Sequence, residues 1–297
     1  MTYDFKFVEL AINFLESGDT EILREISELA ATDTIYNHAR FYNYDVPTNS
    51  KLELVTYLLT PSDKYKEVLP QVVDNLIYAK ENVTKHSLVE KVVMQYFPKE
   101  FLPSGSIYFT FGYDIGICFN INCTLNLAHP FMLDSIGNIK YYAIHEMHHA
   151  GFTELRGGCM PSLAISTYKE MTHLVENLTH LEAMGTYAPL RLREKENAMN
   201  SDIDYIVLQD KALVDDFTKK YFDIYNYFKD HPDYTLTDED WSKLNILSGG
   251  GGERLWYVVG AQMARIIDQQ LGRDALTSLI SQPSENFIAT YMELENR

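Results

Sequence analysis

The spacing of apolar positions predicts helices along most of the chain. The first repeat at helical spacing runs from Phe5 to Leu15 and ends before Gly18, a typical terminator. Further amphipathic stretches follow at about 20–29, 50–59, 63–80 and 84–96. Residues 1–100 are therefore expected to form a helical N-terminal region, and no cluster of ligand or catalytic side chains stands out within it.

A change of pattern after this region predicts a small sheet. Residues 106–111 follow a cluster of breaker residues and are rich in β-branched and aromatic side chains, and apolar and polar residues alternate within 115–127. Beyond Asp134 the pattern is again helical. We therefore expect a mainly helical α+β fold, in which residues 101–297 form the second region.

Glycine and proline positions predict where the later helices end. The segment 150–162 contains several of these residues, enough to reverse the chain between two helices. The glycine run at 249–252 predicts a loop before a helix that includes 256–267. That helix is expected to stop at Gly272, and Pro283 is expected to separate two short helices.

Composition narrows the class of protein. Apolar residues make up 46% of the chain, and 42 acidic against 25 basic residues give a net charge of −17. Such a surface repels phosphate groups, so neither nucleic acid nor an anionic membrane is an expected partner. The chain has no apolar run of about 18 residues and no signal-like N-terminus. We expect a cytoplasmic protein, although the sequence leaves secretion open and does not predict the oligomeric state.

Three cysteines do not change this picture. Cys118, Cys123 and Cys159 are too few and too scattered for a disulfide framework. They include no CxxC pair, so a zinc site made of thiolates is not expected either. The chemistry has to come from other residues.

Residues 138–150, NIKYYAIHEMHHA, contain the motif H-E-x-x-H on a predicted helix. His145 and His149 are four residues apart, so both side chains leave one face of the helix and suit a shared metal ion. Glu146 can reach a water in the open coordination position and act as general base. We expect His148 to lie near this site or on the surface rather than to bind the metal.

Two histidines need a third protein ligand. The metzincin pattern would place a histidine at position 155, where this chain has Leu155, so that class is excluded. Within 171–188 the candidates are Glu176 and Glu182. Glu182 falls on the apolar side, four residues after Leu178, where a carboxylate is costly unless a cation meets it. We therefore expect Glu182 to be the third ligand.

Glu176 lies instead on a polar face of the same predicted helix, where a solvated role is expected. It shares this face with His173 and His180. These three side chains could chelate an ion of their own, but a polar helix face is the simpler explanation.

From these motifs the chain resembles the gluzincin zinc peptidases. The H-E-x-x-H motif is followed at 182–187 by EAMGTY, which is similar to the third-ligand helix of bacterial families of zinc-dependent peptidases. In that helix the two small residues occur in the opposite order. The stretch 256–264, WYVVGAQMA, resembles a helix that follows the ligands in such families. The resemblance covers about 105–295 and implies an active cleft between lobes.

The resemblance implies one zinc ion per chain and hydrolysis of a peptide or protein substrate. A strand from 106–112 or 115–127 would then lie beside an extended substrate. An oxyanion also needs a donor, and Tyr257, which follows the glycine run, is our candidate. Tyr187, His180 and Arg254 are the other residues available.

Two other functions remain open from the sequence. A regulatory or interaction protein could bind zinc without cleaving anything, and a hydrolase could act on a non-peptide amide. The presence of Glu146 favours an enzyme, because a structural zinc site needs no base.

Overall fold

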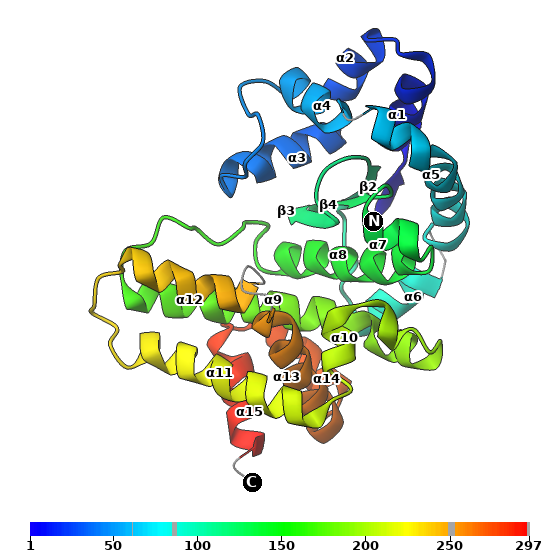
Figure 1. Cartoon of the computed structure of the whole chain (residues 1–297). Coiled ribbons are helices and arrows are strands. Elements are labelled where there is room, and N and C mark those ends of the chain that lie inside the picture. The colour runs from blue at the N-terminus through cyan, green and yellow to red at the C-terminus, as the bar shows by residue number, and fades with distance from the viewer. Residues whose placement is uncertain (61, 85–87, 249–252, 296–297) are drawn as a thin grey trace. The chain divides into compact units, whose positions relative to one another are not determined.

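A computed structural model of the chain describes residues 1–60, 62–84, 88–248 and 253–295. It divides by compactness into two units, which are described separately (Figure 1). The first comprises Met1–Met94 and Leu102–Cys159, and the second comprises Gln95–Phe101 and Met160–Arg297.

Most of the first unit is helical. Its helices are α1 (Lys6–Ser17), α2 (Glu21–Ser27), α3 (Ala30–Phe41), α4 (Lys51–Leu59), α5 (Ser62–Asn82), α6 (Leu88–Val93), α7 (Pro130–Asp134) and α8 (Asn138–Leu155). Its strands are β1 (Thr2–Asp4), β2 (Ser106–Thr110), β3 (Gly116–Phe119) and β4 (Asn122–Asn126). A short 3-10 helix, η1 (Met94–Tyr96), follows α6 and continues into the segment Gln95–Phe101 of the second unit.

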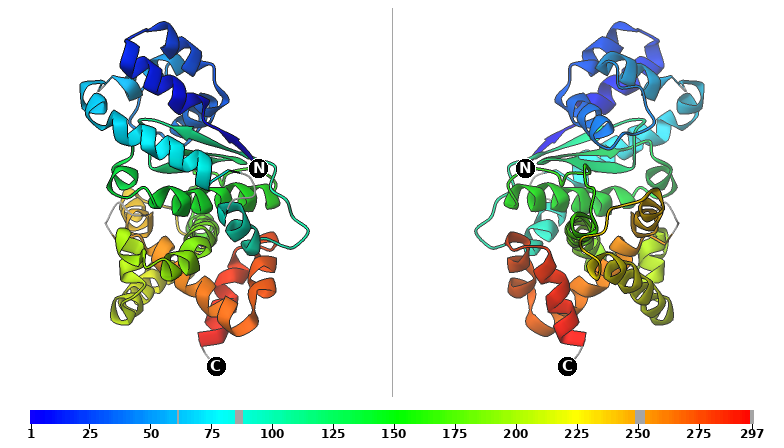
Figure 2. Two further views of the ribbon diagram at one scale, coloured as in Figure 1. Left: turned by 90° about the vertical axis from the view of Figure 1, so that its right-hand side faces the viewer. Right: turned by 90° about the vertical axis from the view of Figure 1, so that its left-hand side faces the viewer.

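The four strands form one sheet in the order β1-β2-β4-β3. The pairs β1–β2 and β2–β4 are parallel, whereas β3 and β4 are antiparallel. Helix α8 packs on one face of the sheet, and α1 and α3 pack on the other (Figures 1 and 2). Strand β3 is therefore an edge strand beside α8.

Local polar contacts fix the chain where it enters β3. The Asn126 side chain accepts hydrogen bonds from the backbone N–H groups of Gly112 and Ala128 and donates one to the Tyr113 carbonyl. The turn between β3 and β4 contains Asn120 in the left-handed region, with φ of 56°, which asparagine tolerates better than most residues. Both features hold β3 in register with β4.

The second unit contains the long helix α9 (Tyr168–Lys195). The remaining helices are α10 (Ile203–Val207), α11 (Lys211–Lys229), α12 (Asp238–Ser248), α13 (Leu255–Leu271), α14 (Arg273–Ser278) and α15 (Glu285–Glu295), with η2 (Met199–Ser201) and η3 (Leu279–Ser281) as 3-10 turns. A capping box of Thr167 and Glu170 begins α9.

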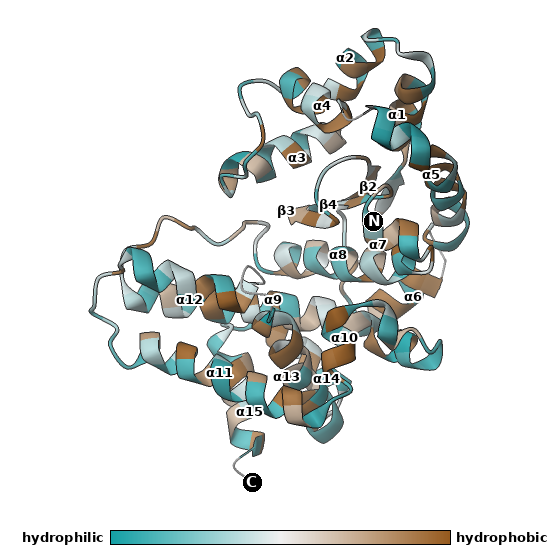
Figure 3. Cartoon of the chain, in the orientation of Figure 1, coloured by the Kyte–Doolittle hydropathy of each residue, from teal (hydrophilic) through white to brown (hydrophobic). Residues whose placement is uncertain are grey.

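Helices α9 and α13 form the core of this unit. Figure 3 shows α13 mostly in apolar colours, and most of its side chains are buried. An alanine Cβ at Gly260 of α13 would lie 2.7 Å from the Ala183 Cβ of α9. The glycine thus permits a close crossing of the two helices, directly beside Glu182.

The expected fold class is confirmed: the chain is mainly helical with one small sheet. The strand at 106–111, the helix ending at Gly272 and the break at Pro283 also match. The stretch 115–127 forms two strands rather than one.

Other expectations differ from the structure or are not tested by it. Helix α3 was not expected, and α8 continues through Gly151 to Leu155, so the turn after it begins later than predicted. The glycine run at 249–252 lies outside the described residues. The two compact units differ in their bounds from the expected regions 1–100 and 101–297, which stay a prediction.

No helix among the described residues has the length and apolar character needed to cross a membrane.

Candidate metal centre

Helix α8 carries the two candidate histidine ligands. His145 and His149 lie one turn apart, with ring centroids separated by 4.3 Å and planes inclined by 75°. His149 is buried and His145 is half-buried. His148 is fully buried near Phe152, with ring centroids 6.2 Å apart, so its predicted alternative place on the surface is wrong.

Glu146 leaves α8 toward the edge strand β3. Its side chain is buried, with 4% of the residue exposed. A Cβ atom built on Gly116 would lie 2.6 Å from Oε1 of Glu146, so any larger residue at this position would force the carboxylate to move. Gly116 could not be identified from the sequence, because no local pattern shows that the start of a strand faces a distant helix.

Glu182, the third candidate ligand, lies on α9 and is half-buried. Glu176 on the same helix is only 4% exposed, and one of its carboxylate oxygens accepts a hydrogen bond of 2.7 Å from the Tyr225 hydroxyl of α11. The expectation of a solvated Glu176 is therefore wrong, because α11 covers that face of α9. The choice of Glu182 as a ligand stays a prediction.

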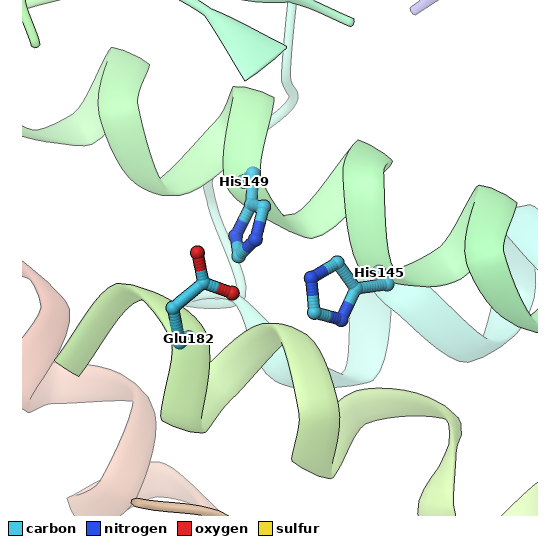
Figure 4. A group of neighbouring side chains, drawn as sticks. All are labelled: His145, His149 and Glu182. Atoms are coloured by element: carbon cyan, nitrogen blue, oxygen red, sulfur yellow. The ribbon is translucent and has the colours of Figure 1, made fainter. Parts of the chain in front are cut away.

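Three of the candidate side chains form a group that suits a metal ion. Figure 4 shows His145 and His149 on α8 and Glu182 on α9. One ligand atom of each residue lies within 4.8 Å of those of the other two. Two imidazole nitrogens and one carboxylate oxygen match the donor set of catalytic zinc sites.

A second group within the described residues consists of His173, Glu176 and Glu285. His180, which the sequence placed with the first two, is not part of it. The His180 ring is buried, stacks on Phe287 at 4.4 Å and has Nδ1 within 3.3 Å of a serine hydroxyl. His180 therefore has a packing role in the second unit.

Arg254 occupies an unusual backbone position at the start of α13. Its φ and ψ are 48° and 49°, a left-handed conformation that costs a residue with a side chain about 1 kcal/mol. The Arg254 Nε atom donates to both carboxylate oxygens of Asp204, at 2.9 and 3.0 Å. Its guanidinium carbon lies 3.6 Å above the centre of the Tyr257 ring.

Electrostatics link these residues to Glu182. Burial raises the pKa of Asp204 to about 6, and the Arg254 guanidinium opposes this rise. The negative charge of Glu182 acts on both groups, raising the pKa of Asp204 and that of Arg254. The cation of Arg254 therefore belongs to the same part of the second unit as the candidate ligand Glu182.

Of the residues considered as oxyanion donors, Tyr187 is bound elsewhere. It is buried and its hydroxyl donates to Asp268 at 2.6 Å. Tyr257 is half-buried beneath Arg254, and its role stays a prediction. Asp204 was not considered from the sequence, because 50 residues separate it from its partner Arg254.

Comparison with known proteins gives one match. No curated protein and no solved structure is similar to the chain at a significant level. The model of one protein family matches residues 17–296, and its description reads "Putative zinc dependent peptidase (DUF5700)". Since this match spans nearly the whole sequence, the chain belongs to the DUF5700 family, whose description names zinc and peptidase activity.

Proposed function

We propose that the chain is a zinc-dependent peptidase of the gluzincin type. One zinc ion per chain would be held by His145, His149 and Glu182, and Glu146 would be the general base. The observation that carries this proposal is the position of Glu146, which follows one ligand histidine and has its carboxylate buried against Gly116 of the edge strand β3. The family match supports the metal and the class of reaction.

Zinc, when bound, supplies a Lewis acid that polarises the scissile carbonyl and makes a water molecule more acidic. Glu146 accepts the proton of the attacking water and then donates it to the leaving amine. The buried position of this carboxylate favours both steps, because few competing water molecules reach it. Tyr257 is proposed to donate to the oxyanion.

The sheet offers a place for an extended peptide. Strand β2 pairs with neighbours on both sides, whereas β3 pairs with β4 alone among the described residues. The stretch 106–112 is therefore unsuitable, and the open edge of β3 can bind the substrate backbone by strand addition. Gly116 on this strand would bring the peptide close to Glu146.

The test combines metal analysis with a variant of the base. We expect about one zinc per purified chain, and we expect Glu146→Gln to keep zinc while losing hydrolysis of a mixed peptide library. Glu154→Gln is the matched control, because Glu154 lies on the same helix and bonds to Ser104 instead. It should retain activity.

Other results of this test would support one of the alternative functions or refute the metal site. A zinc-loaded wild-type protein that cleaves no peptide but cleaves simple amides would be a non-peptide hydrolase. One that cleaves neither would favour a regulatory role. Absence of a transition metal, even after zinc is supplied at neutral pH, would refute the site itself.

A further inference from the structure

Arg254 is held in a fixed orientation by two contacts on the second unit. Its Nε atom donates to both oxygens of Asp204, which is only 5% exposed. One face of the guanidinium lies against the Tyr257 ring. The plane of the guanidinium group is therefore set before any ligand arrives.

The far end of the same group is available. All hydrogen bonds of Arg254 to described residues use Nε, so its two Nη atoms keep their donors for another partner. The Arg254 side chain as a whole is 35% exposed, so it is not sealed from solvent. A guanidinium presents its Nη donors in one plane, which matches the two oxygens of a carboxylate.

Arg273 of the same unit has a structural role and serves as a comparison for Arg254. Arg273 donates to Asp268 from both Nε and Nη2, at 3.0 and 2.6 Å, and its Nη1 atom donates to the Gln95 carbonyl. Each of its three nitrogens has a protein acceptor. Arg254 differs because, among the described residues, its hydrogen bonds to Asp204 use Nε and neither Nη atom.

We infer that Arg254 binds a carboxylate of the peptide substrate. This inference rests on the proposed function, because it places a substrate near Glu182. A carboxylate could come from the free C-terminus or from an acidic side chain, and both offer the same planar pair of oxygens. The enzyme would then prefer peptides with a carboxylate close to the scissile bond.

The test measures binding as well as turnover. One set of short peptides differs only at the C-terminus, as free acid or amide, and a second set has Glu or Gln at an internal position. Binding is measured by titration calorimetry on zinc-loaded Glu146→Gln protein, and kcat and KM are measured on the wild type.

In one of the two sets, we expect the peptide that carries the carboxylate to bind roughly 10–100-fold more tightly than its neutral counterpart. This ratio is typical of hydrogen bonds to a charged group. Arg254→Gln should reduce this ratio to about one, and Arg254→Lys should retain part of it. Arg191→Gln is the control, since Arg191 is an exposed arginine of the same unit, and it should keep the full ratio. Thermal unfolding of each variant identifies those that fail to fold.

The pair that responds identifies the source of the carboxylate, and either response supports the inference. An unchanged ratio in Arg254→Gln, or the absence of any preference in the parent protein, would overturn it. A loss of kcat in Arg254→Gln that is equal for acid and amide would also overturn it, because that result is typical of an oxyanion donor. If no peptide is cleaved but the binding preference depends on Arg254, the proposed function fails and the anion site stands.

Discussion

Replacing Gly116 by alanine tests whether the position of the Glu146 carboxylate sets the rate. A Cβ atom at this position would lie 2.6 Å from Oε1 of Glu146, whereas ordinary contacts begin at 3.4 Å. The carboxylate must therefore move by about 0.8 Å. The Cγ and Cδ atoms of Glu146 would lie 2.8 and 2.9 Å from the same Cβ, so the side chain has to shift together with its carboxylate. The φ of Gly116 is not in the left-handed region, so the strand itself accepts alanine.

A displacement of about 1 Å in a catalytic group typically costs about 100-fold in rate. We therefore expect Gly116→Ala to lower kcat by roughly 10–100-fold, with zinc content and the unfolding temperature nearly unchanged. The assay is steady-state hydrolysis of a peptide that the wild type cleaves, together with elemental analysis of the same sample.

Gly137→Ala is the matched control. A Cβ there meets only the Ser135 hydroxyl, at 3.8 Å, and the φ of −63° is suitable for alanine. A folded, zinc-loaded Gly116→Ala protein with the wild-type kcat would refute the reasoning. Loss of zinc in this variant would also contradict it, because the change would then act on the ligands rather than on the base.

Three further predictions concern the ligand, the core and pH. Glu182→Ala should lower the affinity for zinc by more than about 100-fold in competition with a chelator. Glu176→Gln keeps an acceptor for Tyr225 and should retain the zinc affinity; the reverse result would show that the wrong carboxylate was chosen. Gly260→Ala should lower the free energy of unfolding, measured by denaturant titration, by roughly 1–3 kcal/mol, because its Cβ would lie 2.7 Å from that of Ala183. Adding Ala183→Gly to the same chain should restore part of the loss. Burial lowers the pKa of His38 from 6.5 to about 4, so the unfolded chain takes up this proton at a higher pH than the folded chain. The free energy of unfolding should therefore fall by up to about 3 kcal/mol between pH 6.5 and 4. A His38→Gln variant with the same pH dependence would refute this cause.

The relative positions of His145, Glu146 and His149 could be predicted because their geometry is local, while their roles stay a proposal. Three residues within five positions of one helix fix their own relative directions, so the motif indicates the site before any tertiary contact is known. The helices that bury one clear stripe were predictable for the same reason. The short strand β1 was not, because Thr2–Asp4 becomes a strand only by pairing with Ser106–Tyr108.

The opposite case is the polar face of α9. Thr172, Glu176 and Thr179 follow the pattern of a solvated face, yet all three are buried. The hydroxyls of Tyr221 and Tyr225 on α11 lie within hydrogen-bond distance of Thr179 and Glu176. A pattern along one helix cannot show that another helix brings hydroxyl groups to its polar side, so burial was assigned wrongly there.

Long-range polar pairing also explains why the proposal for Arg254 could come only from the structure. In the sequence it was one of four residues available to an oxyanion, and nothing distinguished it from the others. Asp204, 50 residues earlier, determines which of its nitrogens is used and therefore which remain available. What a charged side chain can bind depends on which of its hydrogen-bond donors a neighbouring residue already uses. A local motif can thus identify candidate metal ligands, whereas the contact proposed for Arg254 depends on distant segments of the chain.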